Sequence, residues 1–201
     1  MQHILEAFIA TIFFGIYLIG SEYVYRSFAS QRFVTRKLTH IVSILFTIWM
    51  SFLLPSNLFL LLLLAYFIVI CVSFNFKIFS FIHRVDRKTY GEIVLPLGLL
   101  AAFLIAAGDQ RIFVASALVL GFSDAAANLV GYIRKSHGKT VYGSLAFFVT
   151  AEIILMLIYG FFPQIAGIAL VAAVCEYVST YGLDNVTIPL SVSILLRLLI
   201  R

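Results

Sequence analysis

Long runs of apolar residues, separated by short polar links, limit what this chain can fold into. Of its 201 residues, 63% are hydrophobic and only 11% are charged, a balance outside the range of soluble domains. A helix needs about 20 mostly apolar residues to cross a bilayer, so the chain has room for seven or eight spans and no separate soluble domain. The apolar runs fall at residues 4–25, 38–54, 57–75, 92–108, 111–133, 143–160, 162–178 and 185–200.

These runs predict one integral membrane domain over residues 1–201, an all-α, polytopic transmembrane bundle of about eight helices. The last run is short, so seven spans followed by a half-inserted segment is the alternative. Links rich in bases alternate with links that have few or none. The basic links contain Arg26, Arg32, Arg36 and Lys37, then Lys77, Arg84, Arg87 and Lys88, and then Arg134, Lys135 and Lys139.

The positive-inside rule places these three basic links in the cytoplasm and the N-terminus outside. Topology therefore explains most of the net positive charge, a phosphate-bearing substrate is a second contributor, and we expect no nucleic-acid partner. Most polar clusters then fall at cytoplasmic helix ends, where a cytoplasmic nucleotide could reach them. They are Arg36-Lys37 with His40, Tyr90-Gly91-Glu92, residues 128–140, Glu176, and Asp184-Asn185.

Arg36, Lys37 and His40 open the second apolar run, and their spacing places His40 on the same helical face as both bases. Cations at a helix N-terminus oppose the macrodipole, but together with that dipole they would suit a bound phosphate. Alternatively, the bases are ordinary positive-inside residues and His40 has its hydrogen bonds satisfied at the interface.

Asp124 lies inside the fifth run, where a carboxylate is costly and usually functional. Asn128 and Gly131 share its helical face. At 1.5 Å per residue, Asp124 sits about 14 Å from the predicted cytoplasmic end, which predicts either a helix break near Gly131 or a polar cavity. The alternative for Asp124 is an ion pair with a buried Arg or Lys. Glu152 lies at a similar depth and could line the same cavity or make an interhelical hydrogen bond.

The link at residues 137–144, His-Gly-Lys-Thr-Val-Tyr-Gly-Ser, contains the lysine, glycines and hydroxyls of which phosphate-binding loops are built. No Walker-type motif occurs in the sequence. Gly143 and Ser144 could simply begin a helix. In the same way, Asp184-Asn185 could be only a helix cap and Glu176 only an interfacial acid.

Taken in order, these segments resemble the CTP-dependent lipid kinase family that includes phytol kinase, dolichol kinase and the yeast-type diacylglycerol kinase. The resemblance covers a catalytic core of about residues 36–190. The matching stretches are Arg36-Lys37-Leu38-Thr39-His40, residues 87–92 with Pro96, residues 123–127 with Gly131, residues 139–144, and residues 176–182 with Asp184-Asn185 and Pro189.

The resemblance implies an enzyme that moves the γ-phosphate of CTP, or of another nucleoside triphosphate, onto the hydroxyl of an isoprenoid alcohol or diacylglycerol in the membrane. An apolar groove between helices would accept phytol, a polyprenol or diacylglycerol alike. Two features depart from the family pattern: Tyr142 stands where members usually have Glu, and the 131–139 loop is shorter than in many of them.

Phosphoryl transfer needs a divalent ion, cations around the triphosphate and a nearby acceptor hydroxyl. We expect Mg²⁺ at Asp124, with Glu176 and Asp184 as further ligands. Either Asp124 or His40 could take the proton of the alcohol, and Glu92 is the candidate to replace the missing family Glu. The expected phosphate- and nucleotide-binding residues are Arg36, Lys37, Asn128, Lys139, Thr140, Gly143, Ser144 and Asn185.

Two other functions fit parts of this pattern. The chain distantly resembles the phosphatidate cytidylyltransferases, in which the α-phosphate of CTP is attacked and pyrophosphate leaves. A small-molecule transporter could also contain an intramembrane Asp and Glu, but it would place polar groups near the midplane and often show an internal repeat. The polar groups here crowd one predicted face of the membrane.

Overall fold

The computed structural model describes residues 2–28, 30, 32–76, 78, 90–136 and 138–200, and gives no side-chain description for residues 2 and 3. In these ranges the protein is all-α. The chain divides into two compact units, Met1–Lys88 and Thr89–Arg201.

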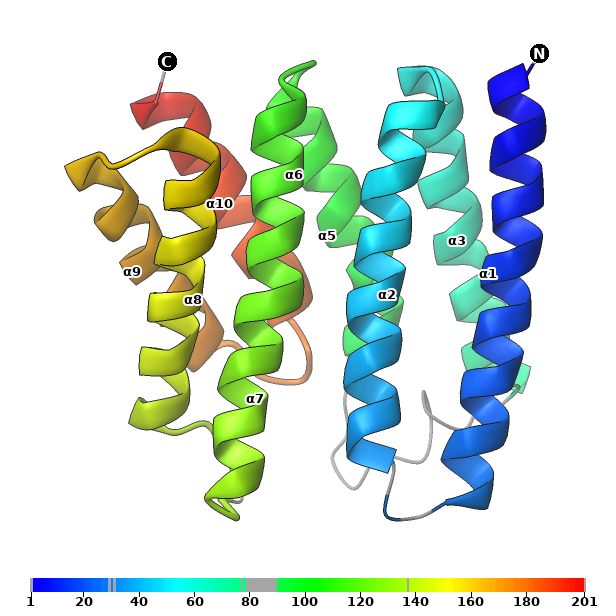
Figure 1. Cartoon of the computed structure of the whole chain (residues 1–201), viewed down its shortest axis with the longest axis horizontal. Helices are drawn as coiled ribbons and strands as arrows, with labels where there is room; N and C mark the ends of the chain where they lie inside the picture. Colours follow the sequence, from blue (N-terminus) through cyan, green and yellow to red (C-terminus); the bar gives the residue numbers. More distant parts are fainter. Residues whose placement is uncertain are drawn as a thin grey trace. The chain divides into compact units, whose positions relative to one another are not determined.

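The first unit consists of α1 (Gln2–Ser27), α2 (Arg32–Leu53) and α3 (Ser56–Phe76) (Figure 1). Helix α2 packs against both α1 and α3. Phe14 of α1 stacks on Phe46 of α2 with ring centroids 4.2 Å apart, and the ring of Tyr66 on α3 lies 6.1 Å from that of Phe46. Aromatic packing, which is worth more than its buried area alone, therefore joins the three helices.

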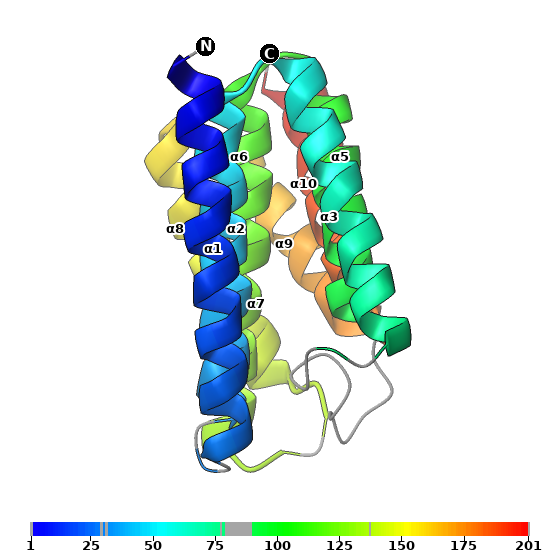
Figure 2. The ribbon, with the colours of Figure 1, turned by 90° about the vertical axis from the view of Figure 1, so that its right-hand side faces the viewer.

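The second unit begins with α5 (Gly91–Ala106) and a continuous rod made of α6 (Gln110–Leu118), the π-helical segment η2 (Val119–Ser123) and α7 (Asp124–Ile133). It continues with α8 (Val141–Tyr159), α9 (Pro163–Val178) and α10 (Asp184–Leu199). Helix α10 packs against α5 and α9, and α8 packs against α7 and α9. Figures 1 and 2 show α5 and α10 side by side.

The described helices form eight continuous segments, one for each apolar run of the sequence. The largest difference lies at α2, which begins at Arg32 rather than at residue 38. Hydropathy marks only the apolar part of a helix, whereas backbone hydrogen bonding continues through the polar residues before it. Arg36 and Lys37 therefore lie beyond the first turn of α2, and the prediction that they sit at its N-terminus is wrong.

Five of the described helices are long and apolar enough to cross a membrane: Ile4–Ser27, Arg32–Leu53, Ser56–Phe76, Gln110–Ile133 and Val141–Tyr159. Gly91–Ala106 and Pro163–Val178 are shorter apolar helices. Several long apolar helices are what a multi-pass membrane protein requires. At 1.5 Å per residue, the 24-residue rod is about 36 Å long and the 16-residue helices about 24 Å.

Gly98 allows α5 and α10 to approach unusually closely. A Cβ atom built at Gly98 would lie 1.9 Å from the backbone oxygen of Asn185 and 2.9 Å from its carbonyl carbon. Backbone atoms of a packed helix cannot move aside as a flexible side chain can. A side chain at position 98 would therefore push α5 away from the first turn of α10.

We predict that Gly98→Ala destabilises the protein by about 1–3 kcal/mol, the usual cost of overpacking. Thermal unfolding of the purified protein in detergent measures the effect as a lower Tm. Gly167→Ala on α9 is the matched control, because a Cβ there meets nothing within 4 Å and alanine favours helix over glycine. Equal Tm values for the two variants would contradict the close approach of α5 and α10.

Candidate functional site

Three carboxylates from three helices of the second unit meet at one place. Asp124 lies at the start of α7, Glu176 near the end of α9 and Asp184 at the start of α10. One oxygen of each side chain lies within 4.8 Å of the other two. Asp124 is 5% exposed and Glu176 is 4% exposed, so two of the three acids are held away from bulk water. We call these residues the carboxylate group.

The carboxylate group has the donor chemistry of a site for a hard divalent cation. Mg²⁺ is bound through carboxylate oxygens and keeps several of its waters, and three acids this close repel one another unless positive charge lies between them. Among the residues that the structure describes, this is the group of three acidic, His or Cys side chains with metal-ligand spacing. The prediction that Asp124, Glu176 and Asp184 belong together agrees with this geometry.

Lys139, on the link between α7 and α8, supplies positive charge to this group. Its Nζ atom lies 3.0 Å from Oε1 of Glu176 and 3.1 Å from Oδ2 of Asp184. The same ammonium donates a hydrogen bond to the backbone oxygen of Glu176, one of the last carbonyls of α9, which have no partner within the helix. With all four groups ionised, the three carboxylates and the ammonium keep a net charge of −2.

Two neutral side chains hold the carboxylates in place. Asn128, one turn after Asp124, donates from Nδ2 to Oδ1 of Asp124 at 2.8 Å and to its backbone oxygen at 2.7 Å. Ser144 of α8 donates to Oε2 of Glu176 at 3.3 Å. Both residues were expected to bind the nucleotide, and in the structure they orient members of the carboxylate group.

The rod α6–η2–α7 explains how an intramembrane aspartate reaches this group. Helix α9 ends at Val178 and α10 begins at Asp184, whereas α7 runs on to Ile133, about 14 Å beyond Asp124 (Figure 1). Of the two alternatives that the sequence leaves open, a helix break near Gly131 or a polar cavity, the break is therefore wrong. Unequal helix lengths, rather than a break, place the middle of the rod beside the ends of α9 and α10.

The π-helical segment Val119–Ser123 immediately precedes Asp124. A π-bulge inserts one residue into an α-helix and so turns the rest of the helix by about 100°, and such bulges are frequent at functional sites. The bulge therefore helps to decide which face of the rod presents Asp124. Hydropathy does not detect a one-residue insertion. The only local sequence features that accompany the π-helical segment are Gly121 and Ser123 within it.

The start of α8 is a capped helix end. The Thr140 side chain, expected to bind the nucleotide, accepts a hydrogen bond from the backbone N–H of Gly143 at 3.0 Å and so caps α8. Gly143 and Ser144 lie in the first turn of α8, as the alternative that they begin a helix requires. Gly143 is buried, and a Cβ there would lie 3.1 Å from the backbone oxygen of Ala127. Gly143 thus lets α8 lie close to α7, which brings Ser144 and Lys139 to the carboxylate group.

The link between α9 and α10 positions Asp184. Tyr181 and Gly182 have φ angles of 55° and 87°, a left-handed turn that glycine adopts without strain. Nδ2 of Asn185 donates to the backbone oxygen of Gly91 at 2.8 Å. The backbone N–H of Tyr90 donates to the backbone oxygen of Tyr181 at 2.9 Å. Asn185, expected to bind the nucleotide, is buried and joins α10 to the start of α5.

Glu92 lies in the first turn of α5, directly after Gly91, and is half-buried. It is not a member of the carboxylate group. Tyr142 is exposed, and the guanidinium carbon of Arg134 lies 3.9 Å from the centre of its ring, which is a cation–π contact. The Tyr142 ring therefore contacts the guanidinium of Arg134. The Glu that lipid kinases usually have at this position would present a carboxylate instead.

The other predicted phosphate-binding residues lie in the first unit, on α2. Arg36 and Lys37 are half-buried there and His40 is 5% exposed. Other residues named in the sequence analysis fall outside the described parts of the chain: Lys77, residues 84–89 and residue 137.

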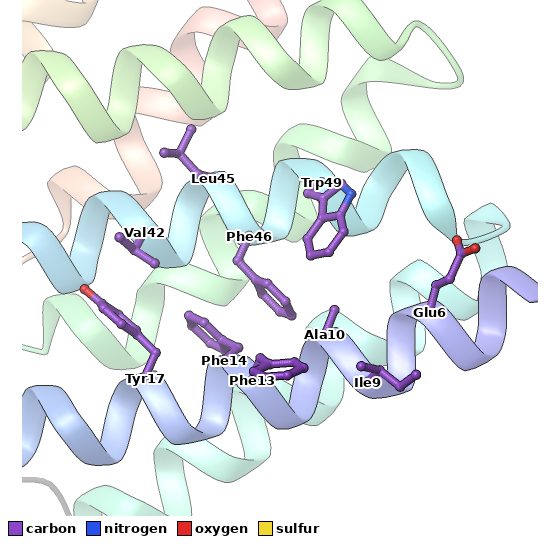
Figure 3. A pocket seen from close by; sticks show the side chains of 10 residues that line it. All are labelled: Glu6, Ile9, Ala10, Phe13, Phe14, Tyr17, Val42, Leu45, Phe46 and Trp49. Atoms are coloured by element: carbon purple, nitrogen blue, oxygen red, sulfur yellow. The ribbon is translucent and has the colours of Figure 1, made fainter.

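An apolar groove of about 750 Å³ lies between α1 and α2 in the first unit (Figure 3). The rings of Phe13 and Phe14 face it from α1, and those of Phe46 and Trp49 face it from α2. The carboxylate of Glu6 marks one end. The groove offers an extended chain almost nothing but apolar surface.

Comparison with known proteins adds a relative of stated activity. A phytol kinase of Synechocystis is 27% identical over 202 aligned residues, which cover 90% of this chain and 86% of that enzyme. This chain is a distant homologue of a phytol kinase. The resemblance to lipid alcohol kinases that the sequence motifs indicate is confirmed.

An uncharacterized protein of Methanocaldococcus jannaschii is 32% identical over 114 residues, 53% of this chain and 58% of that protein. No protein-family model and no solved structure matches the chain significantly. The alignment with the Synechocystis phytol kinase is the broader of the two and extends over both compact units.

Proposed function

We propose that this protein is a membrane lipid kinase that transfers the γ-phosphate of CTP, or of another nucleoside triphosphate, to the hydroxyl of a lipid alcohol. The observation that carries the proposal is the carboxylate group with Lys139 beside it. The homology to a phytol kinase over 90% of the chain supports the same activity. Together they favour an isoprenoid alcohol such as phytol or a polyprenol, with diacylglycerol as the other candidate acceptor.

The carboxylate group would hold Mg²⁺. Three carboxylates are ligands that this ion prefers, and the net charge of −2 at the group matches a divalent cation. When bound, the ion would supply the positive charge that neutralises the triphosphate. Asn128 and Ser144 already hold two of the carboxylates by hydrogen bonds, so the ligands are oriented in advance.

Cationic side chains would hold the phosphates. Lys139 contacts two members of the carboxylate group within the second unit. We also assign Arg36 and Lys37 of α2 to phosphate binding, because their motif resembles that of the lipid kinases. The hydroxyl oxygen of the lipid attacks the γ-phosphorus, the bond between that phosphorus and the β–γ bridging oxygen breaks, and CDP leaves. The hydroxyl proton passes to a base, for which Asp124 and His40 are the candidates.

We assign the carboxylate group to the cytoplasmic side of the membrane and the N-terminus to the outside, as the basic links predict. A nucleotide is then available at the site. The apolar groove between α1 and α2 is our candidate for the lipid chain, because apolar aromatic surface binds prenyl and acyl chains alike.

The test is incubation of purified protein with labelled CTP or ATP and a panel of phytol, a polyprenol and diacylglycerol. We expect a labelled lipid phosphate and release of CDP from CTP. Release of pyrophosphate would instead identify a cytidylyltransferase, and no reaction with any lipid alcohol would contradict a kinase.

Asp124→Asn should lower kcat by at least about 100-fold while the protein still inserts and folds. The substitution removes a metal ligand, and even the loss of an outer-shell partner typically costs 10–100-fold. Glu152→Gln on α8 is the matched control, because Glu152 is a half-buried acid outside the carboxylate group. Equal activity of the two variants would remove Asp124 from the site.

The departure at Tyr142 gives a separate test. If Glu92 supplies the carboxylate that the family Glu usually provides, Glu92→Gln should lower kcat strongly. Tyr142→Phe keeps the ring that faces Arg134, so its kcat should change by less than about tenfold, or 1.4 kcal/mol. An inactive Tyr142→Phe beside a normal Glu92→Gln would show that the phenol hydroxyl has a role of its own.

A further inference from the structure

Lys139 occupies the place where a divalent ion shared by Glu176 and Asp184 would lie. Its Nζ atom is 3.0 Å and 3.1 Å from one oxygen of each. Mg²⁺ bonded to the same oxygens would lie about 2.1 Å from each of them. An ammonium and a divalent ion cannot share this space, because at such short range their like charges repel strongly.

We propose that Lys139 is a displaceable counter-ion of the carboxylate group, which leaves when a divalent cation binds and then moves to the phosphates of the nucleotide. This inference rests on the proposed function and adds an order of events to it. In the absence of a metal, Lys139 keeps the buried acids from repelling one another. In its presence, the same ammonium is free to bind an anion.

The surroundings of Lys139 allow this movement. Its side chain is 28% exposed, whereas that of Glu176 is 5% exposed, so the lysine side chain borders water to an extent that the glutamate does not. The residue lies on a link rather than in a helix. Thr140, the next residue, caps α8 and anchors the backbone, so the four-carbon stem can swing while the main chain stays in place.

This exchange couples the binding of metal to the binding of nucleotide. A free divalent ion must displace Lys139, which weakens its binding. Phosphates that accept the displaced ammonium remove part of this cost, and by linkage the metal raises the affinity for the nucleotide by the same factor. The site would therefore be loaded with metal and nucleotide together.

Titration with Mn²⁺, followed by the EPR signal of the free ion, tests the exchange without nucleotide or lipid. We expect Lys139→Met to bind Mn²⁺ at least about tenfold more tightly than the unaltered protein. Lys135→Met removes the same charge from an exposed position on the same link and should leave the affinity unchanged. Thermal unfolding of each variant establishes that it is folded.

A second measurement uses the unaltered protein, so it does not depend on how the variant folds. Mass spectrometry follows the acetylation of Lys139 and Lys135 with and without Mn²⁺. Displacement predicts that Mn²⁺ raises the acetylation rate of Lys139 at least about threefold and leaves that of Lys135 unchanged. An unchanged rate at Lys139 on saturation with Mn²⁺ would overturn the inference.

The outcomes separate this inference from the proposed function. If the unaltered protein and Lys139→Met bind Mn²⁺ equally, Lys139 is not a counter-ion that the metal displaces, and the kinase proposal stands. If Lys139→Met binds more weakly, Lys139 orients the ligands instead, and the inference is wrong. If no folded form binds Mn²⁺, both the exchange and the proposed metal site fail.

Discussion

The mutual repulsion of three carboxylates in a largely buried place is the constraint on which the second unit depends. Taking an acid out of water is costly unless it is paired and hydrogen-bonded, and here Lys139, Asn128 and Ser144 meet that requirement. Asn128 lies on the same helix as Asp124, whereas Lys139 and Ser144 come from the link before α8 and from its first turn. The capped start of α8 and the turn between α9 and α10 therefore position Lys139, Ser144 and Asp184.

Helix length and helix spacing make this arrangement possible. Because α9 and α10 are shorter than the rod that carries Asp124, their ends meet the rod part-way along its length. The absence of a side chain at Gly98 lets α5 lie against Asn185, the residue next to Asp184. Small residues therefore let the helix backbones approach closely, and the polar side chains then form hydrogen bonds and ion pairs with one another.

The sequence predicts much of this fold, because apolar runs of membrane length leave few alternatives. It also selects Asp124, Glu176 and Asp184 as one metal-binding set, because Mg²⁺ takes carboxylate oxygens, although it places Asp124 about 14 Å from the predicted cytoplasmic end. It does not predict the start of α2 at Arg32, because hydropathy does not record backbone hydrogen bonding. At Gly131 it leaves two alternatives, a helix break or a polar cavity, and does not choose between them. Nor does it predict that Asn185 bonds to the backbone of Gly91, since that is a tertiary contact. The bond from Asn128 to Asp124 is local, one helical turn apart, and the sequence already places both residues on one helical face. The π-helical segment is a one-residue insertion with almost no signal in composition.

The central claim is that the carboxylate group binds a divalent cation. Anomalous X-ray diffraction from crystals of the protein grown with Mn²⁺ and a non-hydrolysable nucleotide tests it directly. The account predicts one strong anomalous peak at coordination distance from oxygens of Asp124, Glu176 and Asp184, with the nucleotide phosphates against it. A well-ordered site without that peak, or a peak bound elsewhere on the protein, would contradict the account.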